Sequence, residues 1–194
     1  KVGHIGVVTK GMIRKGDTVT LSVNAENRNA TCKNHSATHL LQKALRMVLG
    51  THVEQAGSYV DESKARFDFS HPTAMTSQEI LKVEKIVNDA ILAGDAVVTK
   101  IMTPDEARAD GAMALFGEKY GDIVRVVKMG DYSVEFCGGT HVKNTSDIKK
   151  FAILSFTNKG SNTYRIEAAT NKRIKEELLN FSKPYNDEIV KLII

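Results

Sequence analysis

Two short motifs, far apart in the sequence, carry residue types that could do metal chemistry. His35 and His39 are four positions apart, and such residues lie one above the other on a helix face, so both imidazoles can reach one ion. Cys137 ends a predicted strand, and the two glycines after it allow a tight turn that brings His141 to the same point. Three imidazoles and one thiolate form an ordinary zinc shell and do not suit magnesium or calcium. The sequence therefore predicts one Zn²⁺ site held by His35, His39, Cys137 and His141.

Other readings of these residues remain open at this point. Each motif alone is compatible with a solvated histidine pair or an ordinary glycine turn. Cys32 precedes His35 in a Cys-x-x-His spacing and is an alternative ligand, but that choice leaves the Cys137 and His141 pair unexplained. We therefore predict that Cys32 is a small core residue. The three other histidines are expected at the surface or beside the ligands: His4, His52 and His71.

The composition limits the class of protein. An apolar fraction of 42% and a charged fraction of 26% are ordinary for a globular chain. No apolar run approaches the roughly 20 residues that span a bilayer, so no membrane is expected. Two cysteines do not make a disulfide framework, which favours a reducing compartment such as the cytoplasm. The net charge of +4 is compatible with an RNA partner, although composition alone favours a merely lysine-rich surface.

The first ligand pair needs a helix to position it. Asn34 is a predicted helix cap and Gly50 a predicted stop. Between them the apolar residues recur with the helical period: Leu40, Leu41, Ala44, Leu45 and Val48. On the other side, a polar stripe continues from the histidines through Gln42 and Arg46, and such a stripe needs water, a ligand or a site to face.

Strands and helices are mixed in the rest of the chain. A capping box at 76–79 opens a second helix that ends at Gly94, and Pro104 starts a short one. Strands are predicted around residue 53 and at 65–69, 96–101, 123–127, 132–137, 151–156 and 164–169. Because the order shows no regular βαβ alternation, we predict the α+β class. We expect a mixed, largely antiparallel sheet with packed helices, and the zinc site between the first helix and a strand end.

The first 25 residues form a small β unit in this prediction. Val19, Leu21 and Val23 alternate with polar residues, and the Gly16-Asp17 turn before them makes residues 2–9 their hairpin partner. The unit is either complete or the end of a truncated β-barrel. The chain starts at Lys1 within strand-like sequence, as expected of an excised or processed chain.

Longer strings surround the two motifs. They are NHSATHLL at 34–41, HVEQAGS at 52–58, RFDFSH at 66–71, ALFGEKYG at 114–121, CGGTHV at 137–142 and RIEA at 165–168. Together, over residues 1–170, they resemble the editing domain of the alanyl-tRNA synthetases. Free-standing editing proteins and the threonyl-tRNA synthetase editing domain share the two zinc motifs, but fewer of these strings. The glycine-rich strand motif that precedes the editing helix in the family is absent.

The resemblance implies an enzyme that hydrolyses mischarged tRNA(Ala), with Ser-tRNA(Ala) and Gly-tRNA(Ala) as substrates. It maps the zinc ligands onto the same four residues and a substrate-contacting glutamine onto Gln55. The division of the chain is then a β unit at 1–25, a zinc-dependent editing domain at 26–170, and the start of a C-terminal helical region at 171–194, which Pro184 should bend. The full-length enzymes are cytoplasmic, ATP-binding ligases of protein biosynthesis. This chain carries no aminoacylation motif and is not expected to charge tRNA.

The chemistry suggests roles for further residues. Ester hydrolysis needs an oriented water and stabilisation of charge on the carbonyl oxygen, so Gln55 and Cys137 are the predicted catalytic residues. A site that hydrogen-bonds the serine hydroxyl can refuse alanine, because its polar groups would stay unpaired. The candidates for that contact are Gln55, Thr38 and Thr140. Arg46 and Arg165 are the predicted RNA contacts.

Two alternatives remain from the sequence. The chain could be a free-standing editing protein with the same chemistry, or a non-catalytic RNA-binding module in which a closed zinc shell is purely structural. Four protein ligands leave no open position, so the metal either expands its shell, has a loose ligand, or positions and polarises the substrate, which is the role we favour. We expect a monomer that binds the acceptor end of tRNA(Ala).

Overall fold

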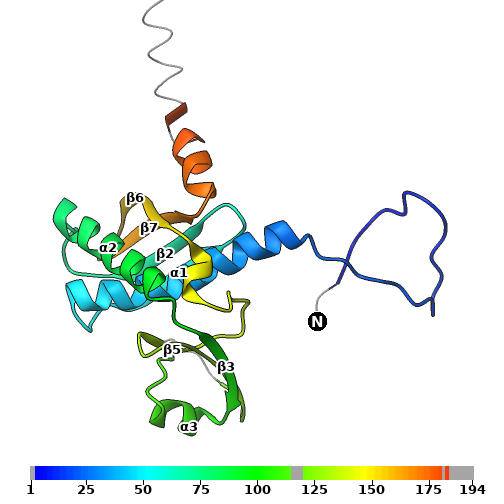
Figure 1. The fold of residues 1–194 in the computed structure, drawn as a ribbon, viewed down its shortest axis with the longest axis horizontal. Helices are drawn as coiled ribbons and strands as arrows, with labels where there is room; N and C mark the ends of the chain where they lie inside the picture. Colours follow the sequence, from blue (N-terminus) through cyan, green and yellow to red (C-terminus); the bar gives the residue numbers. More distant parts are fainter. Residues whose placement is uncertain (1–2, 115–119, 181, 184–194) are drawn as a thin grey trace, which may run out of the picture.

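Two antiparallel sheets, one larger than the other, organise the chain (Figure 1). The computed structural model describes residues 3–114, 120–180 and 182–183. The larger sheet has the order β1 (Gln55–Val60), β2 (Ala65–Ser70), β7 (Thr163–Thr170), β6 (Phe151–Gly160). The smaller sheet has the order β3 (Val97–Met102), β4 (Val124–Met129), β5 (Ser133–Phe136). The helices are α1 (Ala25–Leu49), α2 (Ser77–Ala93), α3 (Pro104–Ala109) and the short 3-10 helix η1 (Thr145–Ile148).

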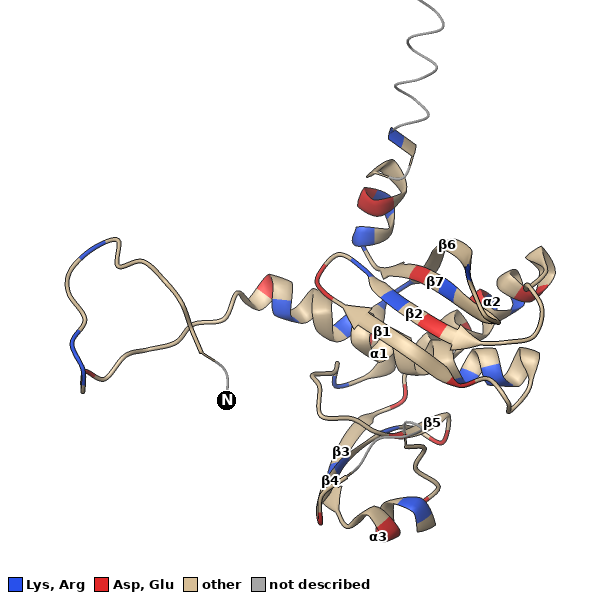
Figure 2. Ribbon diagram, turned by 180° about the vertical axis from the view of Figure 1, so that it is seen from behind, with Lys and Arg blue, Asp and Glu red and all other residues tan. Residues whose placement is uncertain are grey.

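This architecture confirms the α+β class, with two antiparallel sheets in place of the one mixed sheet predicted. The core lies between the larger sheet and the helices α1 and α2. Alternate residues of β2 and β7 point into it, as the two-residue period of a strand requires: Phe67, Phe69, Tyr164, Ile166 and Ala168. The opposite face of the same strands carries both basic and acidic residues (Figure 2).

The second helix follows its local signals. The Thr76 hydroxyl accepts from the Glu79 backbone N–H, and the Glu79 carboxylate accepts from the Thr76 N–H, which completes the capping box. Gly94 ends the helix in the left-handed conformation that a glycine adopts without strain. The predicted bounds of α2 are thus confirmed.

The first helix starts earlier than predicted. Its cap is Asn24, whose side chain accepts from the Asn27 N–H, and not Asn34. Asn34 is fully buried inside the helix, where its amide donates to the Asp61 carbonyl and accepts from the Thr170 hydroxyl. A buried amide with distant partners has the same residue type as a cap, so the sequence alone could not separate the two roles.

The predicted N-terminal β unit is wrong in its secondary structure. Residues 3–24 contain no strand, and the apolar residues of the predicted hairpin, Ile5 and Leu21 among them, are exposed. The Gly16-Asp17 turn does form, since the Asp17 N–H donates to the Arg14 carbonyl. An isolated hairpin is marginally stable, and no described element covers an apolar face of this segment. The division of the chain at 1–25, 26–170 and 171–194 stays a prediction.

The end of the chain is helical where it is described, at 173–180 and 182–183. Pro184 and residues 115–119 of the ALFGEKYG string lie outside the described residues. No helix in the described ranges has the length and apolar character needed to cross a bilayer.

Candidate metal centre

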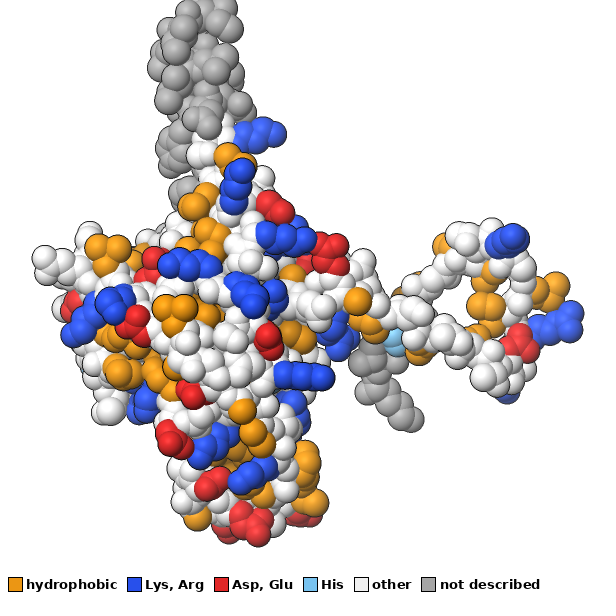
Figure 3. All heavy atoms as spheres, viewed as in Figure 1, with side chains coloured by type: hydrophobic (Ala, Val, Ile, Leu, Met, Phe, Trp, Pro, Cys, Tyr) orange, Lys and Arg blue, Asp and Glu red, His pale blue; other side chains and the backbone are white. Residues whose placement is uncertain are grey.

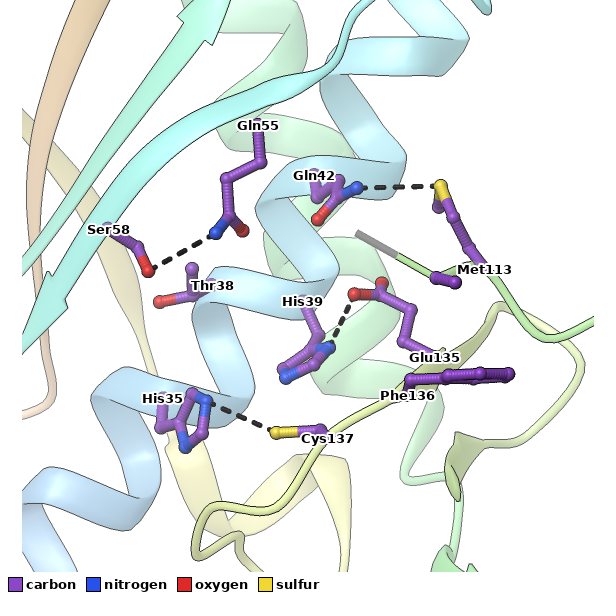
Figure 4. A pocket seen from close by; sticks show the side chains of 11 residues that line it. His35, Thr38, His39, Gln42, Gln55, Ser58, Met113, Glu135, Phe136 and Cys137 are labelled. Carbon is purple, nitrogen blue, oxygen red and sulfur yellow. Dashed lines mark hydrogen bonds and ion pairs between the residues drawn. The ribbon is translucent and has the colours of Figure 1, made fainter. Parts of the chain in front are cut away.

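The two ligand motifs meet between α1 and the loop that follows β5. His35 and His39 point from α1 towards Cys137 (Figure 4), and His141 closes the group. The four possible ligand atoms lie within 4.8 Å of one another. The Cys137 sulfur is 3.5 Å from His35 Nε2 and 3.2 Å from His141 Nε2. This His₃Cys cluster could hold one metal ion, and its soft donors are compatible with zinc.

Each imidazole of the cluster has a partner at Nδ1. His35 Nδ1 lies 3.2 Å from the Thr140 carbonyl, His39 Nδ1 lies 2.7 Å from the Glu135 carboxylate, and His141 Nδ1 lies 3.1 Å from the Ser36 hydroxyl. A proton on Nδ1 leaves Nε2 free as a ligand atom, and the Thr140 carbonyl and the Glu135 carboxylate, which can only accept, favour that tautomer for His35 and His39. Ser36 lies next to His35 in the sequence, on the same helix. In the structure it is buried and also accepts from the Val142 N–H.

The sequence did not point to Glu135, whose carboxylate contacts a ring of the cluster. It is 6% exposed, and its second carboxylate oxygen accepts from the Ser133 hydroxyl at 2.7 Å. It stands two positions before Cys137, and residues two apart in a strand point to the same face. An acidic residue two before a ligand cysteine was therefore the available signal. The carboxylate–histidine arrangement orients the ring and raises its basicity.

The same contacts set the charges in the cluster. Burial alone raises the pKa of the Cys137 thiol, but hydrogen bonds with His141, His35 and His39 outweigh it and lower the pKa to about 3. Burial is the main cause that lowers the pKa of His141, to about 4. Burial opposes the charged form of His39 as well, yet Glu135 and the hydrogen bond with Cys137 raise its pKa to about 10. The thiolate and the neutral His141 are already in the forms that bind metal.

The loop that carries Cys137 is fastened to the smaller sheet. Arg125 of β4 donates to the carbonyls of Cys137 and Gly139, both at 2.7 Å. Gly139 packs against His35 so closely that a Cβ there would lie 2.2 Å from the ring carbon Cε1. Gly138, its neighbour, has nothing within 4 Å of that position. Close packing against His35 therefore requires a glycine at position 139 but not at position 138.

A small pocket of about 100 Å³ opens beside the cluster. His35, Thr38, His39 and Gln42 of α1 form one wall, Gln55 and Ser58 of β1 a second, and Met113, Ala114, Glu135, Phe136 and Cys137 the third (Figure 4). The polar stripe predicted on the first helix thus faces this pocket. Its size suits a small group and not a large side chain.

Gln55 reaches the pocket because β1 contains a bulge. Gln55 pairs with Phe69 and Gly57 with Asp68, so Ala56 is an extra residue in the edge strand. In a regular strand Gln55 and Ser58, three apart, would point to opposite faces, and the extra residue puts both on the pocket side. The Gln55 amide donates to the Ser58 hydroxyl over 3.4 Å, a long hydrogen bond that a ligand could replace.

Of the other predicted contact residues, only Thr38 lines the pocket itself. Thr38 lines the pocket, and its hydroxyl donates to the Asn34 carbonyl, so its oxygen can still accept. Thr140 is exposed, and its carbonyl, not its side chain, serves the site. Arg46 lies in the adjoining hollow beside Gln55 and donates to the Val53 carbonyl at 2.7 Å. Arg165 is outside the pocket, where it forms a two-pronged ion pair with Asp68 at 2.8 Å.

The remaining candidate ligands lie outside the cluster. Cys32 is partly exposed and is not in the buried core, contrary to the prediction for it. His52 and His71 stack on one another with Nε2 and Nδ1 2.9 Å apart, and His4 is exposed.

The chain is similar to known proteins along its whole length. Residues 124–167 fit the family described as the threonyl and alanyl tRNA synthetase second additional domain. All of the chain is 53% identical to "Alanine--tRNA ligase 1" of Lachnoclostridium phytofermentans, and 90% of it is 54% identical to "Alanine--tRNA ligase" of Bacillus pumilus. A Neisseria meningitidis "Alanine--tRNA ligase" is 55% identical over 87% of the chain. The resemblance to the alanyl-tRNA synthetases is confirmed. The chain spans 23%, 20% and 19% of these three relatives, about a fifth of their length.

Replacement of Gly139 by alanine should weaken metal binding. Because the new methyl group meets the His35 ring, that ring must move out of the cluster, and we expect a loss of affinity of at least tenfold, as for a disturbed ligand orientation. The measurement is competition for zinc against a chromophoric chelator. Gly138→Ala is the matched control and should bind as the wild type does. Equal affinity in the two variants would contradict the close packing.

Replacement of Glu135 by glutamine should also weaken metal binding while keeping the fold. The amide fills the same space but loses the charge that orients His39, and loss of such a partner costs about 10–100-fold in affinity. Zinc titration and thermal unfolding of the same samples separate the two effects. Glu167→Gln, which removes an equally ion-paired but distant carboxylate, is the control. A Glu135→Gln variant with wild-type zinc affinity would show that His39 is oriented by packing alone.

Proposed function

We propose that this domain hydrolyses the ester of mischarged tRNA(Ala), with Ser-tRNA(Ala) and Gly-tRNA(Ala) as substrates, as part of an alanyl-tRNA synthetase. One observation carries the proposal. A His₃Cys cluster opens directly into a pocket of about 100 Å³ that also holds polar side chains from α1 and β1. The similarity to alanine--tRNA ligases suggests that the substrate is an ester linked to RNA. The pocket has room for a small amino acid.

The pocket residues divide the work between binding and discrimination. When bound at the four ligands, zinc would position the ester and polarise its carbonyl. The Gln55 amide can donate to the developing oxyanion or to the serine hydroxyl, and Thr38 offers an acceptor beside it. Compared with a seryl group, an alanyl group would lose the hydroxyl that pairs with these polar atoms, at a cost of about 1–3 kcal/mol for each buried group left unpaired. This argument separates seryl from alanyl esters and does not involve the glycyl ester.

Gln55 suits this role by its charge as well as by its position. A neutral amide can donate to an oxyanion without competing for the metal, whereas a carboxylate there would itself be a ligand. Glu135, the carboxylate that does line the pocket, has both oxygens engaged, by His39 and by Ser133. It is therefore a positioning residue for His39 in this proposal.

The alternative is a zinc-stabilised RNA-binding module without catalysis, which the closed set of four ligands favours. Bound zinc does not separate the two functions, because both need it. The names of the relatives favour a synthetase segment over a free-standing editing protein.

A deacylation assay tests the function. Ser-tRNA(Ala) and Gly-tRNA(Ala) should lose their amino acid in the presence of excess protein, and Ala-tRNA(Ala) should be hydrolysed much more slowly. Cys137→Ala should abolish the reaction, because it removes a ligand, whereas Cys32→Ala should retain both zinc and rate at saturating protein. Tight RNA binding by the wild type without any deacylation would establish the non-catalytic module instead.

Gln55→Ala should slow the chemical step without loss of metal. If Gln55 donates in the transition state, the single-turnover rate on Ser-tRNA(Ala) should fall by roughly 10²–10³, the effect of one lost oxyanion donor. The zinc content should stay at the wild-type level. Gln78→Ala on α2, an exposed glutamine far along the chain from the site, is the matched control. A rate within about twofold of wild type, far less than one such donor supplies, would remove Gln55 from the reaction.

A further inference from the structure

A second hollow borders the same cluster. The pocket is lined by His35, His39 and Cys137, whereas His141 lines a separate groove of about 390 Å³ between α1 and the segment after β5. Lys33 of α1 and the two lysines Lys143 and Lys149 also line it. We refer to it as the lysine groove. It begins at the metal cluster, since His141 belongs to both.

The charge of the lysine groove is positive and largely uncompensated. Within the described ranges none of its three lysines forms an ion pair, while Lys64 and Arg165 on the outer face of the larger sheet do. Asp147 is the acidic residue in the lining, and one of its oxygens accepts from the Asn144 N–H at the start of η1. Figure 3 shows lysine and arginine side chains, with some acidic ones between them, around the place where the N-terminal half of α1 leaves the body.

The lysines stand on fixed backbone. Lys33 is in the N-terminal half of α1, and the Lys143 carbonyl accepts from the Val97 N–H at 2.9 Å. Lys149 has φ 75° and ψ −66°, a strained conformation for a residue with a side chain, and its N–H donates to the Ser146 carbonyl. Such strain persists only where the surroundings enforce it, and here it directs a lysine to the rim of the groove.

The other end of the pocket is less suited to a polyanion. The hollow there contains Arg46 and Glu54, whose charges cancel, and Arg46 already donates to the Val53 carbonyl. By contrast, the lysine groove shares His141 with the metal cluster. A strand in the lysine groove would therefore pass directly beside the cluster.

We propose that the lysine groove binds the phosphodiester backbone of the RNA strand whose aminoacylated 3′ end enters the pocket. This inference rests on the proposed function, because it takes the RNA-linked ester as the ligand of the pocket. It assigns the phosphate contacts to Lys33, Lys143 and Lys149 in place of Arg46 and Arg165, which already have protein partners.

The test is the double substitution Lys143→Gln with Lys149→Gln, which removes two charges and keeps side chains of similar length. Binding of uncharged tRNA(Ala) is measured against salt concentration. Each lost phosphate contact on a single strand lowers the slope of log affinity against log salt by about 0.7, so we expect a decrease of about 1.4. With equal affinities at 1 M salt, that slope predicts about 25-fold weaker binding at 0.1 M. Lys82→Gln with Lys159→Gln, two exposed lysines without ion pairs among the described residues, is the control.

A second substrate separates RNA contact from damage to the site. Seryl-adenosine has the ester but no phosphate, so both double variants should hydrolyse it at the wild-type rate and retain zinc. An unchanged salt slope on tRNA(Ala), or an equal loss of rate on seryl-adenosine, would overturn the groove as the RNA site. If the wild type hydrolyses neither Ser-tRNA(Ala) nor seryl-adenosine, the proposed function is wrong. The binding data on uncharged tRNA(Ala) would still show whether the lysine groove binds RNA.

Discussion

The structure depends on keeping one partly buried thiolate next to three imidazoles. Their convergence joins α1, which packs on the larger sheet, to the loop after β5 of the smaller sheet. Polar rings that are partly or wholly buried need hydrogen-bond partners in fixed geometry, and the chain provides them through Ser36, Glu135 and the Thr140 carbonyl. Arg125 and the absent side chain of Gly139 serve the same purpose from the loop side. The contacts around the site therefore hold the three histidines and Cys137 in one cluster.

Selectivity in such a pocket depends on the hydrogen bonds that its polar lining residues would lose with the wrong substrate. The pocket combines a polar edge, Gln55 and Thr38, with an apolar one, Met113 and Phe136. A small hydroxylated group can satisfy both, whereas an apolar group of the same size leaves amide and hydroxyl atoms without partners. The bulge at Ala56 matters for this reason, because it puts both Gln55 and Ser58 of the edge strand β1 on the pocket side.

The sequence predicted those features whose signals are local. The capping box and Gly94 bounded α2, and the spacing of the two histidines together with the Cys-Gly-Gly turn indicated the cluster. It failed where the deciding contact is distant. Asn34 has the type of a helix cap, but its partners are Asp61 and Thr170, and the alternating residues before Asn24 have no described surface on which to pack as a strand. Glu135 was visible in principle, two residues from Cys137, but its importance depends on His39 across the pocket.

The length of α1 has a consequence for how this region can change. One uninterrupted helix of 25 residues carries a wall of the lysine groove at Lys33, two cluster histidines, and the pocket residues Thr38 and Gln42. Each residue added to or removed from it would rotate everything beyond by about 100° and shift it by about 1.5 Å. Substitutions can therefore adjust each compartment separately, but an insertion or deletion in α1 would misalign all of them together. The side chain at each position of α1 can therefore change, whereas the spacing between the positions is fixed.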